Sequence, residues 1–474
     1  MSGASIDRTL EQPEADILRD GPGSLMLLGT SRRGREIWLD RDAMTRHMMV
    51  VGTTGSGKSE LLLGMSANAI ASGNGVLFVD GKGDIATFAK LHAIAERFGR
   101  GGDVLLLNLS GKPVIDADGR VHPVSNSLNP FQDLPASDIT TIVTSMMEMP
   151  ERDAMWHARA VAMVTAVVDA LVWLRDAKDT PLTIDRLRQS CSLGEIIKLA
   201  STLQHRDMPD TVRRGLDSYL DSLPGYMEHK GALQSNTTME QHGYLQMQVT
   251  RLFSLLGDTY AHVFDTPGSQ IDMRDVVLNR RILMVMLPVL EKSTVEIAIL
   301  GRIVVALLKN MMATAMRAPI EGAWKDVVDK RPTQAEYPFL VILDEVSHYM
   351  TDGMGAMAGQ ARSLGFCLVF AAQDLSGMDY ANRREAAAIQ ANTGTKIYMR
   401  MLDPSELDHR GVLPSSTRYS NGMSEASDRT RDEIRLVSER FERANGGRGY
   451  FAASDRGELQ AIGQQLLELY EHAV

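Results

Sequence analysis

The amino-acid sequence predicts an α/β fold with a mostly parallel central sheet and an inserted all-α domain. Short apolar runs alternate with helical stretches over residues 46–132, which is typical of parallel strands covered by helices on both faces. Over residues 133–265 the strand-like runs disappear and only a helical period remains. Strand-like runs return in residues 266–474. We therefore expect a sheet that the helical domain interrupts and the last part of the chain completes.

Residues 1–45 are expected to form a lead-in and a β-hairpin. Two apolar runs between Leu25 and Leu39 flank a turn sequence that ends in Gly34. Glycine supplies the backbone angles that a tight hairpin turn needs.

The other elements are predicted from apolar runs and helical periodicity. The expected strands are His47–Val51, Val76–Asp80, Asp103–Leu109, Ile282–Leu287, Phe339–Leu343, Cys367–Ala371 and Lys396–Met399. The expected helices include Lys58–Ser72 and, in the insertion, Ile139–Met149, Ala154–Leu174, Ile184–Ser190, Leu193–Leu203, Thr211–Leu223 and Gln241–Leu256. The polar segment Ser415–Arg431 is expected to be a loop.

Composition narrows the class of protein. The chain has 474 residues, of which 44% are hydrophobic, and a formal net charge of -10. That length can bury a large core, and the acidic balance gives no support to broad, non-specific nucleic-acid binding. Only two cysteines are present, Cys191 and Cys367. They exclude a disulfide framework and a four-cysteine zinc site, and they indicate a reducing, cytosolic protein.

Two apolar stretches are candidates for membrane spans. Ala160–Leu174 is short and contains Asp169, and Ile297–Met316 is interrupted by Arg302 and Lys309. Because a spanning helix needs about 20 predominantly apolar residues, we expect buried helices instead.

A phosphate-binding loop follows the first expected strand of the sheet. Its glycines let backbone N–H groups point at phosphates, and the N-terminal end of the next helix adds positive charge. Lys58 is expected to reach the β- and γ-phosphates and Ser59 to bind Mg²⁺. The loop fits the pattern G-x-x-x-x-G-K-[ST] with Gly52, Thr53, Thr54, Gly55, Ser56, Gly57, Lys58 and Ser59. A plain glycine loop is the alternative.

Two acids follow the apolar strand Phe339–Leu343. Ligand sites in parallel sheets lie at the carboxyl ends of strands. We expect Asp344 to hold the Mg²⁺ shell and Glu345 to act as the general base that polarises the attacking water. Acids that only begin a helix are the alternative.

Two further polar residues are candidates for the reaction. Gln373 ends the next strand and is a candidate γ-phosphate sensor; its alternative is a strand-end amide that satisfies loop backbone. Arg362 is a candidate arginine finger that enters a neighbouring subunit's site; its alternative is a solvated arginine or a local ion pair.

The segment Asp80-Gly81-Lys82-Gly83-Asp84 follows the second strand, which we expect beside the phosphate-loop strand in the sheet. Its glycines allow close backbone approach, and its charges are candidates to line the site. A structural turn is the alternative.

Together these stretches resemble the TraD/TraG-like ATPases, the coupling proteins of type IV secretion systems, and within them the Dot/Icm branch. The resemblance rests on HMMVVGTTGSGKSELLL (His47–Leu63), VLFVDGKGD (Val76–Asp84), SLNPF (Ser127–Phe131) and the stretch Val341–Asp374, with weaker agreement over Ala391–Leu413.

The resemblance implies a RecA-like P-loop NTPase core that binds ATP and Mg²⁺ and works as a hexameric ring. It implies that Arg362 is the finger and Gln373 the sensor. It implies partners among secretion-channel components and substrate adaptors, with protein or DNA as substrate. We expect this chain to be the cytosolic portion, at the cytoplasmic face of the bacterial inner membrane through an anchor or partner that the sequence does not contain.

Three functions remain open. The first is an ATPase coupling protein of type IV secretion or conjugation, which the helical insertion favours. The second is a double-stranded DNA translocase of the FtsK/HerA kind. The third is a substrate receptor that nucleotide mainly stabilises.

Overall fold

The computed structural model describes residues 24–30, 36–110, 114–115, 121–122, 124–144, 147, 154–201, 207–316 and 333–400. The expected loop Ser415–Arg431 and the rest of residues 401–474 lie outside this range. The chain divides into two compact units, and the boundaries between them fall after Ser110 and after Asp272. Residues Arg302–Asn310 are also assigned to the second unit. We call the two parts the sheet unit and the helical unit.

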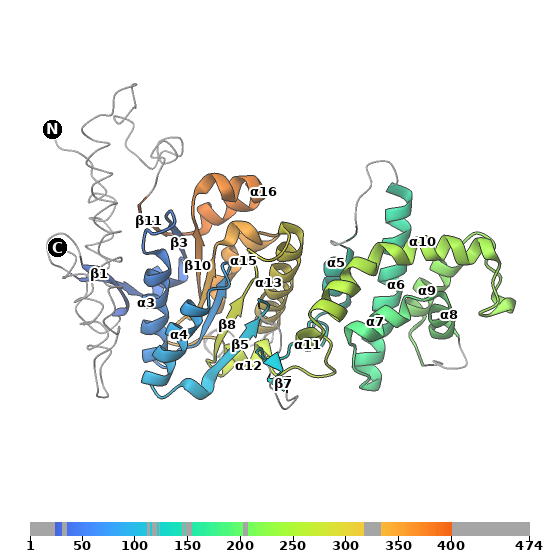
Figure 1. Cartoon of the computed structure of the whole chain (residues 1–474), viewed down its shortest axis with the longest axis horizontal. Coiled ribbons are helices and arrows are strands. Elements are labelled where there is room, and N and C mark those ends of the chain that lie inside the picture. Colours follow the sequence, from blue (N-terminus) through green and yellow to red (C-terminus); the bar gives the residue numbers. More distant parts are fainter. Residues whose placement is uncertain are drawn as a thin grey trace, which may run out of the picture. The chain divides into compact units, whose positions relative to one another are not determined.

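A seven-stranded sheet forms the centre of the sheet unit (Figure 1). Its order is β11-β3-β10-β9-β4-β8-β5, and every pairing between neighbours is parallel. The strands are β3 (Met48–Val51), β4 (Val76–Asp80), β5 (Val104–Asn108), β8 (Ile282–Met286), β9 (Phe339–Asp344), β10 (Phe366–Ala372) and β11 (Thr395–Tyr398). The parallel α/β sheet and its seven predicted strands are therefore confirmed.

The strand order corrects one sequence-based expectation. The strand β4 lies between β9 and β8, not beside the phosphate-loop strand β3, whose neighbours are β11 and β10. The five inner strands are buried along their whole length, whereas β5 and β11 at the edges are partly exposed. Near-continuous apolar runs are what a sheet covered on both faces requires.

Helices cover the sheet, and most follow directly from a strand. They are α2 (Arg41–Thr45), α3 (Lys58–Ala71), α4 (Ile85–Arg97), α12 (Met273–Leu278), α13 (Thr294–Met316), α15 (Met354–Ala361) and α16 (Leu375–Asn392), with short 3-10 turns at Gly101–Asp103, Val346–His348 and Arg362–Leu364.

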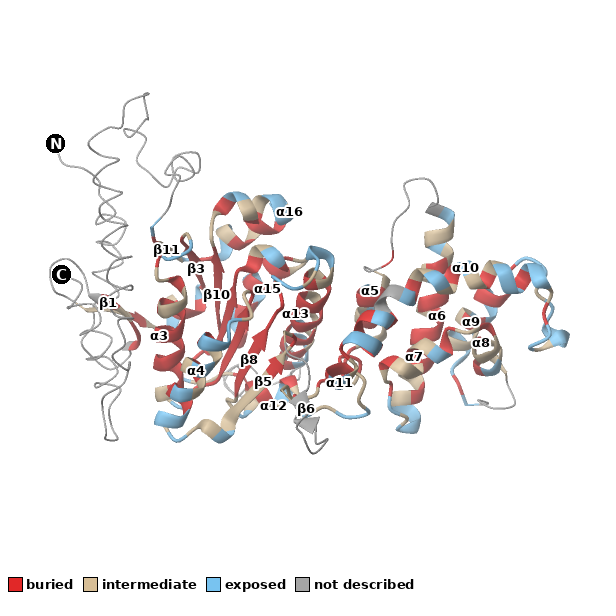
Figure 2. Cartoon of the chain, in the orientation of Figure 1, coloured by how far each residue is buried: buried red, intermediate tan, exposed pale blue. Residues whose placement is uncertain are grey.

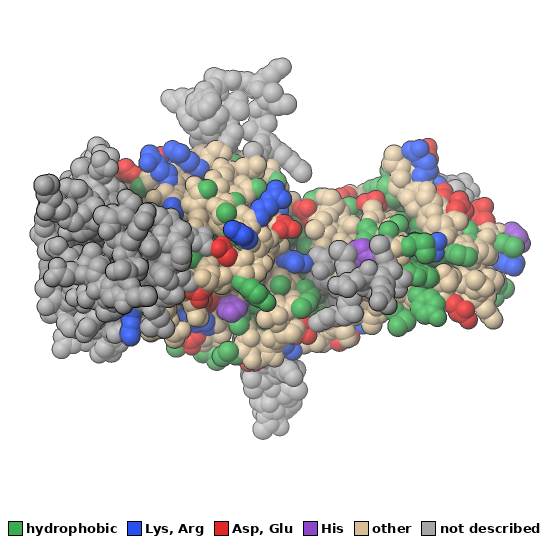
Figure 3. Space-filling model, turned by 90° about the horizontal axis from the view of Figure 1, so that it is seen from above, with side chains coloured by type: hydrophobic (Ala, Val, Ile, Leu, Met, Phe, Trp, Pro, Cys, Tyr) green, Lys and Arg blue, Asp and Glu red, His purple; other side chains and the backbone are tan. Residues whose placement is uncertain are grey.

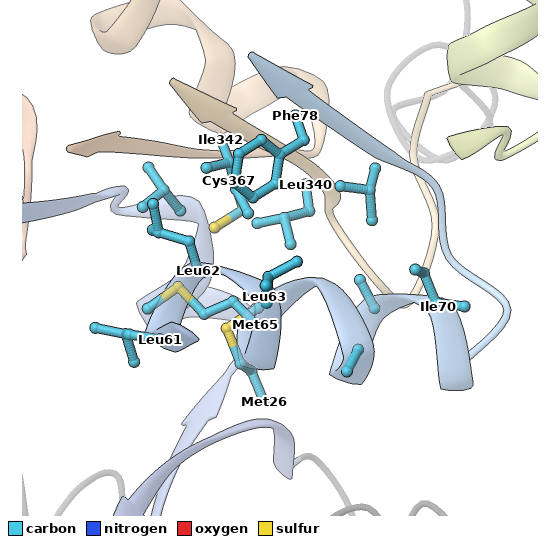
Figure 4. Packing of buried hydrophobic residues seen from close by; sticks show 14 of the residues in the cluster. Met26, Leu61, Leu62, Leu63, Met65, Ile70, Phe78, Leu340, Ile342 and Cys367 are labelled. Atoms are coloured by element: carbon cyan, nitrogen blue, oxygen red, sulfur yellow. The ribbon is translucent and has the colours of Figure 1, made fainter. Parts of the chain in front are cut away.

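The helix α3 packs on two sides. Figure 4 shows Leu62 and Leu63 facing strand residues such as Ile342, while Leu61 and Met65 lie toward Met26. Met26 belongs to the antiparallel hairpin of β1 (Ser24–Thr30) and β2 (Glu36–Asp40). A helix covered on both sides is apolar nearly all round, which explains why α3 lacks a polar stripe. This packing holds the helix that begins at Lys58.

The helical unit contains the predicted insertion. Its helices are α5 (Ala136–Thr144), α6 (Ala154–Lys178), α7 (Ile184–Ser190), α8 (Leu193–Ala200), α9 (Asp210–Asp221), α10 (Asn236–Phe253) and α11 (Ala261–Phe264), with a 3-10 turn at Glu228–Lys230 and a π-helical segment at Ser254–Thr259. A two-stranded pair, β6 (Val114–Ile115) and β7 (Val121–His122), also belongs to it. The limits predicted at residues 133 and 265 lie inside its bounds.

Buried polar residues tie the helical unit together. Tyr219 Oη lies 2.7 Å from His242 Nδ1, and His242 Nε2 lies 3.0 Å from the carbonyl oxygen of Cys191. Asn129 is buried; its amide donates to the carbonyl of Leu182 at 2.9 Å and its side-chain oxygen accepts from Phe131 N at 2.9 Å. The Asn-Pro of the resemblance therefore has a structural role here.

Figure 2 shows buried residues along the inward sides of these helices. Large apolar side chains are also exposed on the helical unit, and Figure 3 shows hydrophobic groups over it. They are Met155, Met227, Leu233, Met239, Tyr244 and Met247.

Two described helices are long and apolar enough to cross a membrane: Met155–Lys178, 50% buried in the chain, and Thr294–Ala315, 61% buried. Core helices of soluble proteins have the same properties.

Candidate nucleotide-binding site

The phosphate-loop sequence connects β3 to α3, as the pattern requires. Gly55 and Gly57 have φ angles of 77° and 84°, a region that glycine occupies without strain. A Cβ atom on Gly52 would lie 2.6 Å from Ser56 Oγ and 2.8 Å from Met399 Cβ, so this position has no room for a side chain. Thr54 and Gly55 are exposed, whereas Ser56 and Lys58 are buried.

The fold brings Lys58 to the two predicted acids. Lys58 Nζ lies 2.8 Å from Glu345 Oε1 and 3.7 Å from Asp344 Oδ1. All three side chains are at most 4% exposed. An ion pair this deeply buried is strongly coupled, and loss of one partner leaves a buried charge.

The acids end β9 in a strained turn. Glu345 has a φ of 51°, which is uncommon for a residue other than glycine. Asp344 Oδ1 accepts from Glu345 N at 3.0 Å, and Tyr349 Oη donates to the carbonyl of Asp344 at 2.9 Å. Such local strain is maintained by surrounding contacts and is frequent at functional sites.

Burial and charge separate the pKa values of the two acids. Burial raises the pKa of Asp344, although Lys58 and Lys82 oppose this effect. Burial also acts to raise the pKa of Glu345, but the charges of Lys58 and Lys82 outweigh it, so this pKa is lowered. Glu345 is therefore the more readily ionised carboxylate of the pair.

Gln373 lies in the same cluster. It follows β10, the strand beside β9, and its Nε2 donates to Glu345 Oε1 at 3.2 Å. The other oxygen, Glu345 Oε2, is buried and has no hydrogen-bond partner among the described residues. One carboxylate oxygen of Glu345 is thus held by several donors, and the other accepts from none in the described part of the chain.

Arg362 lies apart from this cluster. Arg362 precedes β10 and Gln373 follows it, so the two residues lie at opposite ends of this strand. Its Nη2 lies 2.9 Å from Asp42 Oδ1, and both side chains are more than half exposed. The structure thus shows the local ion pair that was the alternative, between two exposed side chains.

The Asp80–Asp84 loop is the site component that the sequence left most open. Lys82 Nζ lies 3.3 Å from Glu345 Oε1. Asp80, the partner of Asp344 in the β4–β9 pairing, is buried, and burial raises its pKa to about 6. The run of charges directly after a buried strand was the signal that could have identified this contact. The sequence did not show that this strand, β4, lies beside β9.

The donor set fits a nucleotide with Mg²⁺. Mg²⁺ at phosphate sites usually takes only one or two protein oxygens, with water and phosphate supplying the rest. Ser59 lies in the first turn of α3 and Asp344 at the end of β9, and these remain the oxygens expected to contribute. The positive-φ glycines of the loop and the unpartnered, buried Glu345 Oε2 are compatible with this ligand. No cluster of three or more His, Cys, Asp or Glu side chains suited to a metal occurs in the described part of the chain.

Comparison with known proteins finds two family models and one curated relative. Residues 338–442 match the family described as the TraM recognition site of TraD and TraG, and residues 17–96 match the FtsK/SpoIIIE family. The type 4 coupling protein DotL of Legionella pneumophila is 39% identical over 396 residues. That alignment covers 81% of this chain and 51% of DotL, so the chain spans about half the length of this relative.

Solved structures show the same fold. The bacterial conjugative coupling protein TrwBdeltaN70, in an unbound form, matches with a TM-score of 0.51 and 16% identity, over 85% of this chain and 78% of that chain. The plasmid coupling protein TrwB in complex with a non-hydrolysable GTP analogue matches with a TM-score of 0.51 over 85% and 80% of the two chains. The expected RecA-like P-loop core is therefore confirmed. In sequence the chain is similar to the type 4 coupling protein DotL, and it shares the fold of solved coupling proteins.

Proposed function

We propose that the chain is the ATPase part of a type IV secretion or conjugation coupling protein. The observation that carries the proposal is the buried contact between Lys58 of the phosphate loop and Glu345 at the end of β9. Coupling-protein structures with non-hydrolysable GTP and ATP analogues support nucleotide as the ligand. ATP binds with its phosphates on the Gly52–Ser59 loop, and Mg²⁺ is held by Ser59 and Asp344.

Hydrolysis needs the Lys58–Glu345 pair to open. Lys58 turns to the β- and γ-phosphates, and the carboxylate of Glu345 takes a proton from water through Oε2. The water oxygen bonds to the γ-phosphorus while the bond from that phosphorus to the β–γ bridging oxygen breaks, giving ADP and inorganic phosphate. Mg²⁺ held by Ser59 and Asp344 would neutralise phosphate charge. Gln373, which already contacts Glu345, senses the γ-phosphate.

Arg362 serves a neighbouring subunit in a hexameric ring. Its exposed guanidinium lies at the amino end of β10, and Gln373 lies at the carboxyl end. Action in trans is supported because Arg362 cannot stabilise charge at its own site from there. Trans arginines contribute mainly to the transition state of phosphoryl transfer.

The ATPase delivers protein or DNA substrates to a secretion channel at the inner membrane. The DotL relationship and the match to a TraM recognition region support secretion partners and adaptors. The FtsK/SpoIIIE match favours the translocase alternative, but it covers only residues 17–96, the part with the phosphate loop, and leaves out the helical unit.

The test is ATP turnover against protein concentration, with and without single- and double-stranded DNA. A specific rate that rises with concentration and with DNA supports a DNA-delivering motor. A rise with concentration alone supports delivery of protein. Stimulation by double-stranded DNA alone favours the translocase, and nucleotide binding with negligible turnover favours the receptor. Lys58→Ala is the control that identifies turnover belonging to this site.

A further inference from the structure

The loop between β4 and α4 brings a second lysine to Glu345. Lys82 Nζ lies 3.3 Å from Glu345 Oε1, the oxygen that also accepts from Lys58 at 2.8 Å. The two lysines differ in exposure: the side chain of Lys82 is 37% exposed, whereas that of Lys58 is 4% exposed. One carboxylate oxygen therefore has two cationic partners from different parts of the chain.

The loop fixes the position of Lys82. Asp80 Oδ1 accepts from the backbone N–H of Lys82 at 2.8 Å, and Asp80 Oδ2 accepts from that of Asp84 at 2.8 Å. A Cβ atom on Gly81 would lie 2.7 Å from Glu345 Cβ and 2.9 Å from the carbonyl oxygen of Asp344. The loop backbone thus packs directly on the end of β9, and this close approach places the lysine that follows.

Only one of the two lysines can stay with Glu345 during hydrolysis. Lys58 is the lysine of the phosphate loop, and it cannot serve the phosphates while its ammonium remains on Glu345 Oε1. Among the described residues, Lys82 and Gln373, at 3.3 Å and 3.2 Å, are the remaining donors to that oxygen.

We propose that Lys82 is a positioning residue that holds Glu345 Oε1 while Lys58 is engaged with phosphate, and so keeps Oε2 aimed at the attacking water. This inference rests on the ATPase function proposed above. Fixing Oε1 determines where Oε2 points, because the two oxygens belong to one planar group. A general base must lie within hydrogen-bond reach of the proton that it takes, so a freely rotating carboxylate slows the step.

The first test separates binding from turnover. In the full chain, Lys82→Met should lower kcat for ATP about tenfold while KM changes by less than about twofold, because the contact orients the base and does not bind substrate. Lys82→Arg, which keeps a cationic donor, should recover most of the rate. Lys90→Met is the matched control: Lys90 is 42% exposed and is also paired with a glutamate, Glu60, and its loss should leave kcat unchanged.

The second test asks whether Lys82 acts through Glu345. In a Glu345→Gln background, Lys82→Met should have no further effect on single-turnover hydrolysis, because the group that it orients is no longer a base. An equal loss in both backgrounds, or a raised KM with normal kcat, would mean that Lys82 contacts phosphate and would overturn the proposal. If the wild type hydrolyses ATP and Lys82→Met has the same kcat as the wild type, the proposal would also be overturned. Absence of Lys58-dependent turnover in the wild type would overturn the ATPase function, and the role of Lys82 with it.

Discussion

Lys58 Nζ donates to Glu345 Oε1 at 2.8 Å, across a sequence separation of 287 residues. The contact joins the loop that is suited to phosphate with the acid that is suited to activate water. The contact also pairs the proposed phosphate-binding cation with the proposed general base. In the proposed site, nucleotide therefore competes with a buried carboxylate for Lys58.

Lys58→Ala should lower turnover at saturating ATP by at least about a hundredfold, because the phosphates lose their buried cation. A coupled-enzyme or radiolabelled phosphate assay measures this. Circular dichroism checks that the variant is folded. Undiminished turnover would remove the Gly52–Ser59 loop from the proposed site.

Glu345→Gln should bind ATP more tightly than the wild type while hydrolysing it much more slowly. The amide no longer competes as an anion for Lys58, so the lysine is available to phosphate. We expect the dissociation constant for ATP to fall about tenfold, equivalent to about 1.4 kcal/mol. Calorimetry with a non-hydrolysable analogue checks the affinity. Weaker binding would show that the Lys58–Glu345 pair does not compete with nucleotide.

Arg362→Ala should leave nucleotide affinity nearly unchanged and slow hydrolysis about a hundredfold or more at protein concentrations where subunits associate. The reason is that the arginine acts on the neighbour's transition state. Arg46→Ala is the matched control, because Arg46 is similarly exposed and pairs with the same residue, Asp42. Equal effects of the two substitutions would assign both arginines to surface ion pairing alone.

Gly81→Ala should lower turnover through steric displacement. Its new methyl group meets Glu345 Cβ and the carbonyl of Asp344, so the loop or the end of β9 must shift, at a cost of about 1–3 kcal/mol in the free energy of unfolding. Gly102→Ala meets nothing within 4 Å and serves as the control. Chemical denaturation together with kcat measures both effects. A fully active Gly81→Ala variant would contradict the close packing of loop and acids.

His47 should make the protein less stable in mild acid. Burial lowers its pKa to about 4, from an ordinary value of 6.5, and its ring bonds the carbonyl of Ala358 at 2.7 Å and accepts from Leu368 N at 3.2 Å. The unfolded chain therefore binds the proton between pH 6.5 and 4, and the folded chain does not. The free energy of unfolding should fall by about 3 kcal/mol as the pH decreases through this window.

The measurement is urea denaturation at several pH values for wild type and His47→Gln. The neutral amide cannot gain the proton, so the variant should show a shallower loss of stability with acid. Parallel pH curves for the two proteins would show that other groups cause the acid sensitivity.

Local sequence signals were sufficient for the seven strands of the sheet and for most of the inserted helices, but not for the β6–β7 pair. The seven apolar runs that became sheet strands are each short and bounded by turns or helices, and their burial in the sheet follows from their composition. The Gly52–Ser59 loop is a local pattern whose glycines are needed for local backbone angles. Helical periodicity likewise indicated most of the inserted helices.

The contacts between distant segments were decided by the tertiary structure. The strand order could not be derived from the sequence, so the Asp80–Asp84 loop was expected beside the phosphate loop. In the structure it packs on Asp344 and Glu345, because β4 pairs with β9. Arg362 lies at the amino end of β10 and pairs with Asp42, a partner that no sequence pattern indicated. The physical reason is that helical and strand periods depend on neighbouring residues, while strand order and ion pairing depend on which buried surfaces pack together. The sequence by itself thus determined the nucleotide loop, the strands and the helices, and the tertiary structure alone decided that Lys58, Lys82 and Gln373 converge on one oxygen of Glu345.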